Sequence, residues 1–109
     1  MSQRFTLTPE QRREADAGRF VRLGPAFGSV IVARIAGAWV AYANECRHRA
    51  LPLDLGARSP MSDDGSHILC HQHGALYRLT DGKCIAGPCT GESLTSLAVH
   101  EDGDTLEIG

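Results

Sequence analysis

Two short motifs in this 109-residue chain combine cysteine with histidine. Residues 46–48 read Cys-Arg-His, residues 70–73 read Cys-His-Gln-His, and 21 residues lie between the two motifs. Thiolate sulfur and imidazole nitrogen suit a transition metal or an iron–sulfur centre, whereas magnesium and calcium prefer oxygen ligands. The pattern therefore predicts a four-ligand centre made by Cys46, His48, Cys70 and His73.

A structural zinc site is the first alternative for this ligand set. Zinc accepts two cysteines and two histidines, but its usual motifs place about two to four residues between paired cysteines and about three to five between paired histidines. Here each motif mixes the two ligand types, with one residue between Cys46 and His48 and two between Cys70 and His73. Such mixed halves can place two thiolates on one iron and two imidazoles on another.

Length and charge limit the classes of function. The chain is expected to form one domain, residues 1–109, with a modest core. A formal net charge of -2 and a pI near 6.2 provide no basic surface for nucleic acid and no lysine-rich face for a membrane. The sequence has no apolar run of about 18 residues or more and no signal-peptide core at its N-terminus, so we expect a cytoplasmic protein. In a reducing compartment, the cysteine and histidine spacings favour metal binding over disulfides.

The first half of the chain predicts a short helix followed by strands. Thr8 can cap a helix, Gln11 stands at the third helical position, and Gly18 marks the end. The next segments, which are expected to be strands, are residues 20–23, 29–35 and 38–44. Ala36-Gly37 is expected to form a tight turn, so the first metal motif begins where a hairpin ends.

The second half predicts a loop and further hairpins. Residues 51–66 hold three potential strand breakers and a polar run, so they are expected to form a loop. Asp81-Gly82 is a hairpin signal. The expected strands are residues 66–69, 75–79, 97–100 and 105–108. Together these elements predict a mostly β, antiparallel domain with one or two short helices.

The sequence resembles the Rieske family of [2Fe-2S] proteins, whose pattern is C-x-H, an intervening segment, and C-x-x-H-G. The four candidate ligands match position for position, and Gly74 matches the glycine after the second histidine. The resemblance spans roughly residues 20–108, and the further matching positions are Leu53, Gly56, Gly82 and Gly87-Pro88. It implies one Rieske-type [2Fe-2S] cluster. It also implies a small antiparallel Rieske-like β-sandwich with a short N-terminal helix and a cluster-binding subdomain of two ligand loops, about residues 44–91.

The resemblance also implies a chemistry. Neutral imidazoles make such a cluster less negative than an all-cysteine cluster, so it accepts an electron more readily. His48 and His73 are expected near the tip of the domain, where they would form the electron exit and couple reduction to protonation. A soluble one-electron carrier between a flavin reductase and a terminal oxygenase or other oxidoreductase follows. Oxygenase activity is not expected, because the related oxygenases need a separate mononuclear iron site.

Departures from the family pattern indicate a subtype. Respiratory Rieske subunits carry two extra cysteines that form a clamping disulfide, and this chain has Leu51 and Gln72 near those places. High-potential members have a serine where this chain has Ala75 and a tyrosine where it has Tyr77. Loss of one hydrogen-bond donor predicts a low to intermediate potential, and Tyr77→Phe is expected to lower it further. The alternative for Tyr77 is a core aromatic whose hydroxyl reaches the surface.

Two more departures concern the ligand loops. His71 stands where the family often has proline, and Ala50 where it often has glycine. Arg47 and Arg49 bracket His48 and are expected either to offer a cationic rim to a partner or to be ordinary solvated side chains.

Cys84 and Cys89 have no predicted role as ligands. They are expected to be buried thiols beneath the Pro88 loop, a local disulfide, or a redox-sensitive pair.

Two other functions remain open from the sequence. The chain could be a small Rieske subunit or regulatory module of a larger, nitrite-reductase-like enzyme, which would co-purify with it. It could also be a zinc-stabilised binding module, in which case the purified protein would be colourless and free of labile sulfide.

Overall fold

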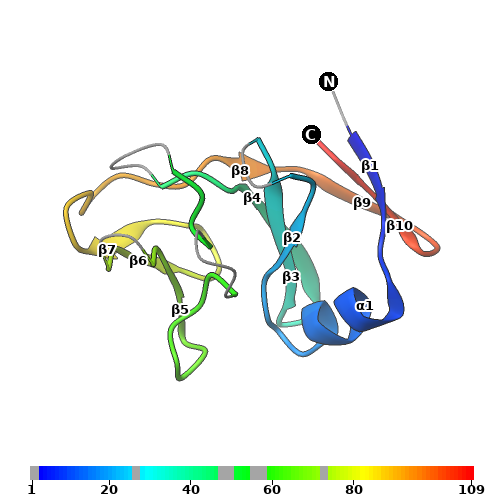
Figure 1. Ribbon diagram of the computed structural model, residues 1–109, viewed down its shortest axis with the longest axis horizontal. Coiled ribbons are helices and arrows are strands. Elements are labelled where there is room, and N and C mark those ends of the chain that lie inside the picture. The colour runs from blue at the N-terminus through cyan, green and yellow to red at the C-terminus, as the bar shows by residue number, and fades with distance from the viewer. Residues whose placement is uncertain (1–2, 26–27, 47–50, 55–58, 72–73) are drawn as a thin grey trace.

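The computed structural model describes residues 3–25, 28–46, 51–54, 59–71 and 74–109. Within these ranges the chain forms one α-helix and ten β-strands, which make three antiparallel sheets. The sheets follow one another along the longest dimension of the molecule, which measures 38 Å (Figure 1). The mostly β, antiparallel fold is therefore confirmed.

The sheet at one end joins the two ends of the chain. Its order is β1-β10-β9, formed by Gln3–Thr6, Thr105–Ile108 and Val99–Asp102. Strands β10 and β9 form the predicted closing hairpin, whereas β1 was not expected. The sequence of β1 is short and mostly exposed, and its pairing partner lies about a hundred residues away, so no local pattern announces it.

Helix α1 covers residues Pro9–Asp16 and confirms the predicted N-terminal helix. The Thr8 side chain accepts a hydrogen bond from the backbone N–H of Gln11, and the Gln11 side chain accepts one from the backbone N–H of Thr8. This reciprocal capping box satisfies two donors that a helix start leaves free. Gly18 follows the helix with φ +83°, which glycine adopts without strain.

The central sheet has the order β2-β3-β4-β8, formed by Val21–Leu23, Val30–Ile35, Ala38–Ala43 and Ser96–Leu97. Strands β3 and β4 pair over their full lengths. They are joined by Ala36 and Gly37, with φ values of +52° and +83°. Positive φ at both central residues is typical of the type I′ hairpin turn, so the predicted hairpin is confirmed.

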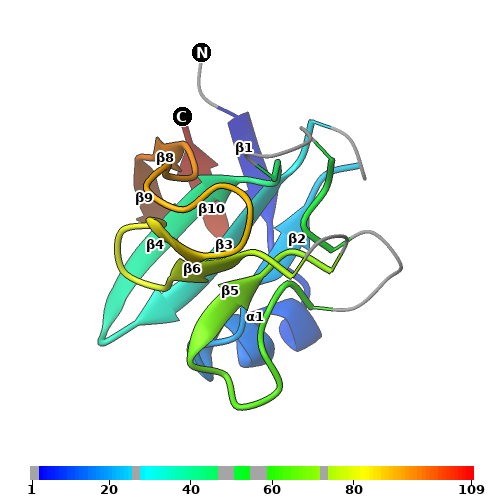
Figure 2. The same cartoon turned by 90° about the vertical axis from the view of Figure 1, so that its left-hand side faces the viewer.

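The third sheet has the order β5-β6-β7, formed by His67–Leu69, Leu76–Arg78 and Cys84–Ala86. It faces the viewer in Figure 2, in front of the central sheet. Its β6–β7 pairing shifts register between Leu76 and Tyr77, as at a β-bulge. A bulge re-aims neighbouring side chains, and this one lies beside the candidate site.

Two predicted segments need correction. Residues 97–100 do not form one strand: Leu97 ends β8 in the central sheet, and Val99 begins β9 in the sheet of the termini. The predicted loop at residues 51–66 is not wholly irregular, because Met61 forms an antiparallel bridge with Ile68. Both details depend on which strand lies alongside, so strand propensity alone did not reveal them.

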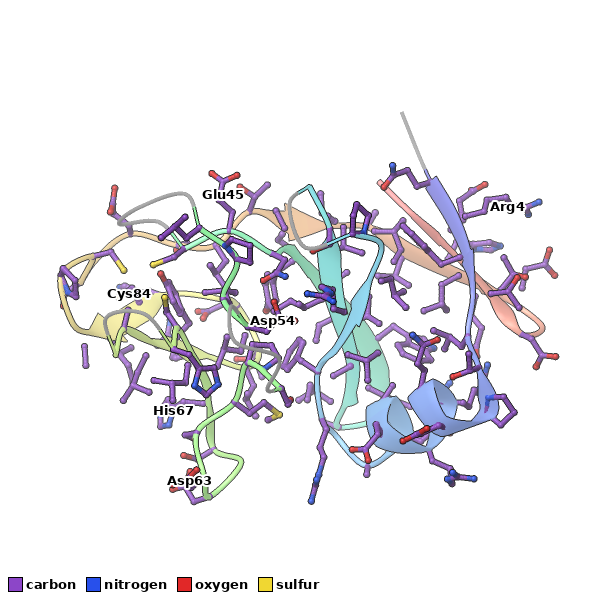
Figure 3. All side chains as sticks on the ribbon, viewed as in Figure 1. Arg4, Glu45, Asp54, Asp63, His67 and Cys84 are labelled. Carbon is purple, nitrogen blue, oxygen red and sulfur yellow. The ribbon has the colours of Figure 1, made fainter. Side chains whose placement is uncertain are left out.

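The core divides into two clusters of buried side chains. One lies between the central sheet and the β5-β6-β7 sheet and contains all four cysteines together with Tyr42 and Tyr77. The other lies between the central sheet and the sheet of the termini and is purely aliphatic among its buried members. Cys84 and Arg4, labelled in Figure 3, mark the two opposite ends of the molecule. Within the described ranges, no helix has the length and apolar character needed to cross a bilayer.

Candidate metal centre

The two predicted cysteine ligands leave the ends of two different strands. Cys46 follows β4 and Cys70 follows β5, and their exposed fractions are 1% and 0%. Both belong to the same core cluster, so the fold brings these two cysteines into one buried core. Four other predicted site residues lie outside the described ranges: Arg47, His48, Arg49 and His73.

Backbone hydrogen bonds hold the described parts of both ligand loops. The N–H of Cys46 donates to the carbonyl of Leu51 at 2.7 Å, which closes the first loop at its base. The N–H of Cys70 donates to the carbonyl of Ala75 at 2.9 Å, which closes the second. His71 N–H then donates to Leu53 O at 3.1 Å and joins the two loops directly.

Gly74 shows why glycine follows the second motif. Its N–H donates to the carbonyl of Cys70 at 2.9 Å, and its φ is +72°. Because most side chains are strained in this left-handed region, glycine allows the turn that brings the chain back into β6.

The buried side chain of Asn44 supports the first ligand loop. The Asn44 side-chain amide donates to Asp54 Oδ1 at 2.9 Å and to Ser29 Oγ at 3.0 Å, while its oxygen accepts from the backbone N–H of Leu53 at 2.8 Å. Asp54 is only 6% exposed and also pairs with Arg22 at 3.5 Å. These bonds fix Leu53 and Asp54 to the central sheet. Sequence reasoning missed Asn44, although an asparagine just before a ligand loop was a usable signal.

Tyr77 lies at the centre of this core. It is fully buried, and its hydroxyl oxygen is 3.6 Å from the Cys46 sulfur and 3.0 Å from the Cys89 sulfur. The alternative in which the hydroxyl reaches the surface is therefore wrong. The contact with Cys89 was not foreseen, because these two residues come from different segments.

Cys84 and Cys89 are free, buried thiols. Cys89 donates a hydrogen bond to the Cys84 sulfur at 2.9 Å, and Cys84 donates to the carbonyl of Ala86 at 3.3 Å. Burial, followed by the hydrogen bond with Cys89, raises the pKa of the Cys84 thiol to about 11. Of the three predicted alternatives, the structure contains the buried thiols.

The predicted cover loop packs on the second ligand loop. Gly87 has a φ of +100°, and a Cβ placed on it would lie 2.8 Å from the Cα of Ala75. Pro88 follows at the surface, and Cys89 turns back into the core with 2% exposure. The loop therefore needs glycine at 87 because the backbones of the two loops are in close contact.

The family comparison identifies the type of centre. The Rieske [2Fe-2S] domain family matches residues 8–101 of the chain. The chain belongs to the Rieske family. Its domain accordingly binds a [2Fe-2S] cluster and acts in electron transfer. No curated protein matches the sequence.

Solved structures with the Rieske fold resemble this chain. A carbazole-bound oxygenase in complex with ferredoxin, from carbazole 1,9a-dioxygenase, has a TM-score of 0.72 and 21% identity over 98% of this chain and 27% of that chain. The terminal oxygenase of carbazole 1,9a-dioxygenase from Nocardioides aromaticivorans IC177 has a TM-score of 0.64 and 23% identity over 84% of this chain and 26% of its own. This Rieske chain thus spans about a quarter of the length of those two chains.

A third solved structure matches over most of its own length. It is a complex of reduced oxygenase and oxidized ferredoxin in carbazole 1,9a-dioxygenase, with a TM-score of 0.63 and 22% identity. The match covers 84% of this chain and 89% of that chain. The same fold therefore occurs in chains of very different length.

The described residues fit a Rieske cluster in their chemistry. Cys46 and Cys70 supply two sulfur donors from one water-poor core, and Tyr77 brings a hydroxyl to one of these sulfurs. Thiolates are the ligands that iron–sulfur clusters require, and nearby donors tune their potential.

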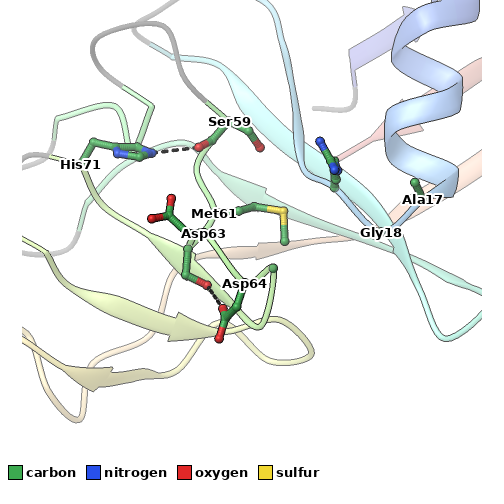
Figure 4. A pocket seen from close by; sticks show the side chains of 10 residues that line it. Ala17, Gly18, Ser59, Met61, Asp63, Asp64 and His71 are labelled. Carbon is green, nitrogen blue, oxygen red and sulfur yellow. Dashed lines mark hydrogen bonds between the residues drawn. The ribbon is translucent and has the colours of Figure 1, made fainter.

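A cavity of about 540 Å³ lies beside this Rieske core, between the end of α1 and the hairpin that precedes β5 (Figure 4). His71 reaches its wall and its Nε2 is 2.8 Å from the carbonyl oxygen of Ser59. Hydrogen bonds from Ser66 and then from Ser62 lower the pKa of Asp64, another lining residue, to about 2. The cavity is thus acidic and hydrophilic on one side, and none of the four cysteines lines it.

Proposed function

We propose that this Rieske protein is a one-electron carrier whose cluster is held by Cys46, His48, Cys70 and His73. The observation that supports the ligand set most directly is the convergence of Cys46 and Cys70 in one buried core, at the ends of strands from two different sheets. The bound cluster supplies reversible one-electron chemistry. His48 and His73 lie outside the described residues and complete the set by their spacing and by the family pattern.

Residues of this chain set the polarity and the hydrogen bonding around the proposed centre. The cysteine sulfurs are removed from water, which limits solvent rearrangement on electron transfer. Tyr77 contributes a hydroxyl beside Cys46, while Ala75 contributes no donor. One donor rather than two supports a potential in the low to intermediate part of the Rieske range.

The proposed route runs from a flavin-dependent reductase to a terminal oxygenase or another oxidoreductase. The support is the resemblance to chains in structures described as oxygenase–ferredoxin complexes, one of which matches over 89% of its own length. In this route the protein is a carrier and not itself an enzyme. Arg47 and Arg49 are proposed as a cationic rim for an acidic partner. The thiols of Cys84 and Cys89 suit the reducing cytoplasm.

A matched pair of cysteine variants tests the ligand set. Cys70→Ser should abolish the absorption and electron paramagnetic resonance signals of the dithionite-reduced cluster and release iron and labile sulfide. Cys84→Ser changes an equally buried thiol and should keep two irons and two sulfides per chain. Equal cluster content in both variants would contradict the assignment. A colourless, zinc-loaded wild-type protein would establish the zinc-binding alternative instead.

A second candidate is a Rieske subunit or regulatory module of a larger reductase. It is favoured by the matches in which this fold makes up only about a quarter of a longer chain. Gel filtration after co-expression with neighbouring reductase components separates the two functions. A carrier elutes alone and is reduced by catalytic amounts of flavin reductase, whereas a subunit co-elutes in a fixed ratio.

A further inference from the structure

A chain of sulfur and hydroxyl groups runs from Cys46 into the core. The Tyr77 hydroxyl oxygen stands 3.6 Å from the Cys46 sulfur and 3.0 Å from the Cys89 sulfur. The Cys89 sulfur is 2.9 Å from the Cys84 sulfur, which is 3.3 Å from the carbonyl oxygen of Ala86. Only the first of these contacts involves a predicted cluster ligand.

The direction of these hydrogen bonds follows from the number of protons. The carbonyl of Ala86 can only accept, so the Cys84 thiol donates to it. Cys89 donates its single proton to the Cys84 sulfur. The contact between Tyr77 and Cys89 then has one proton left to form it, and that proton belongs to the Tyr77 hydroxyl.

Distance decides which sulfur receives that proton. A cluster-bound thiolate is intrinsically the stronger acceptor, because it carries charge. The Cys89 sulfur, however, is 3.0 Å from the hydroxyl oxygen, compared with 3.6 Å for Cys46. Hydrogen bonds weaken as the donor and acceptor separate, so Cys89 competes with Cys46 for the hydroxyl proton.

The cover loop holds Cys89 in this position. The backbone N–H of Cys84 donates to Glu92 O at 2.7 Å, and Glu92 N–H donates to Cys89 O at 2.9 Å. The raised pKa of Cys84 keeps its thiol protonated near neutral pH. Its proton therefore stays available for Ala86, and its sulfur stays an acceptor for Cys89.

We propose that Cys89 is a positioning residue that draws the Tyr77 hydroxyl proton away from Cys46 and thereby lowers the reduction potential of the centre. A hydrogen bond to a ligand sulfur stabilises the reduced state, so weakening it favours the oxidised state. This inference rests on the proposed role of Cys46 as a ligand. It assigns to the cover loop an electronic role besides coverage.

A double-mutant cycle on the full-length holoprotein tests the proposal. Midpoint potentials are measured by redox titration for the wild type, Cys89→Ala, Tyr77→Phe and the double variant. Cys89→Ala should raise the potential by the equivalent of up to about a tenfold change in the reduction equilibrium constant, ~59 mV for one electron. Tyr77→Phe should lower the potential only slightly in the wild type. In the Cys89→Ala background, it should cancel the whole rise.

Two further variants separate hydrogen bonding from packing. Cys89→Ser keeps a donor and an acceptor, so its potential should lie closer to the wild-type value than that of Cys89→Ala. Ile68→Val shortens a buried side chain of the same core, opposite Tyr77 in the β5–β6 pairing, and should leave the potential unchanged.

The outcomes distinguish this inference from the proposed function. A potential that falls or stays constant in Cys89→Ala overturns the inference, as does a rise that persists after Tyr77→Phe is added. In both cases an intact Rieske resonance spectrum leaves the carrier function standing. Absence of that spectrum from the wild type refutes the ligand set and, with it, the inference.

Discussion

The two ends of the molecule differ in how many polar side chains they bury. At the end with α1 and the termini, Glu101 pairs with Arg12 and Arg34 on the surface, and each of these side chains is about a third exposed. Arg34 also stacks 4.8 Å from the centre of the Trp39 ring. At the end with the β5-β6-β7 sheet, Arg78 and Asp81 also pair at the surface, but further polar groups lie inside, as with Tyr77 between two sulfurs.

This difference has an energetic meaning. An exposed ion pair can exchange its partner for water, so its contribution to stability is small. A buried polar group has no such replacement, so each lost partner is costly. The end with Tyr77 therefore depends on a few specific hydrogen bonds, whereas the other end depends on its aliphatic core and tolerates changes in charge.

The largest effect is expected from Asn44→Ala. This change removes the partner of the Leu53 N–H and one partner of the Asp54 carboxylate, which are both buried. Loss of a buried partner costs about 1–3 kcal/mol for each group. We therefore expect a destabilisation of roughly 4 kcal/mol and faster loss of the cluster. Urea unfolding and the rate of bleaching in a chelator measure the two effects. Destabilisation below about 1 kcal/mol would show that water satisfies these groups.

Gly87→Ala should have the next largest effect. Its Cβ would approach the Ala75 Cα to 2.8 Å at a φ of +100°, so backbone strain and overlap add to about 3 kcal/mol. Gly91→Ala is the matched control in the same loop, because it has a φ of +95° and open space around the new Cβ. Only the Gly87 variant should disturb the visible spectrum of the cluster. Equal destabilisation in both variants would argue against close packing of the loops.

An alkaline transition is expected from Tyr42. Burial, and then the charge of Asp81, raises its pKa to about 12, and its hydroxyl donates to the carbonyl of Leu79 at 2.9 Å. The unfolded chain loses this proton near pH 10, so the stabilisation is complete below pH 10 and is lost as the pH rises toward 12. The loss should be on the order of 2–3 kcal/mol at most. Unfolding of the wild type and Tyr42→Phe between pH 9 and 12 checks it, since the variant should show a flatter dependence.

The smallest effect is expected from Glu101→Gln at the other end. It removes the charge that faces Arg12 and Arg34, but these groups remain in contact with water. We expect a loss of less than about 1 kcal/mol that shrinks further in high salt. Thermal unfolding at low and high ionic strength measures it. A loss as large as that of Asn44→Ala would remove the distinction between the two ends.

Local patterns in the sequence predicted much of this fold. The capping box of Thr8 and Gln11 and the turn at Ala36-Gly37 depend on neighbours within a few residues, and both are present. Strand β1 was missed because Phe5 pairs with Leu106, a contact that no local pattern encodes. The division at Ala98 between β8 and β9 escaped prediction for the same reason.

The candidate site shows the same division. The spacing of Cys46 and Cys70 and the glycine at position 74 were sufficient to recognise the family, since these are properties of short segments. The support from Asn44 and the contact between Tyr77 and Cys89 were not, because they join segments from different sheets and loops.

By itself, the sequence indicated the chemical type of the proposed ligands and the turn at Gly74, and it was sufficient to recognise the family. Ligand identity and turn formation depend on side-chain chemistry and on local backbone conformation. Only the tertiary structure decided that the Tyr77 hydroxyl stands between the sulfurs of Cys46 and Cys89, and closer to Cys89. A hydrogen bond requires a donor and an acceptor at a particular distance in space, and that distance is set when the cover loop packs against the sheets.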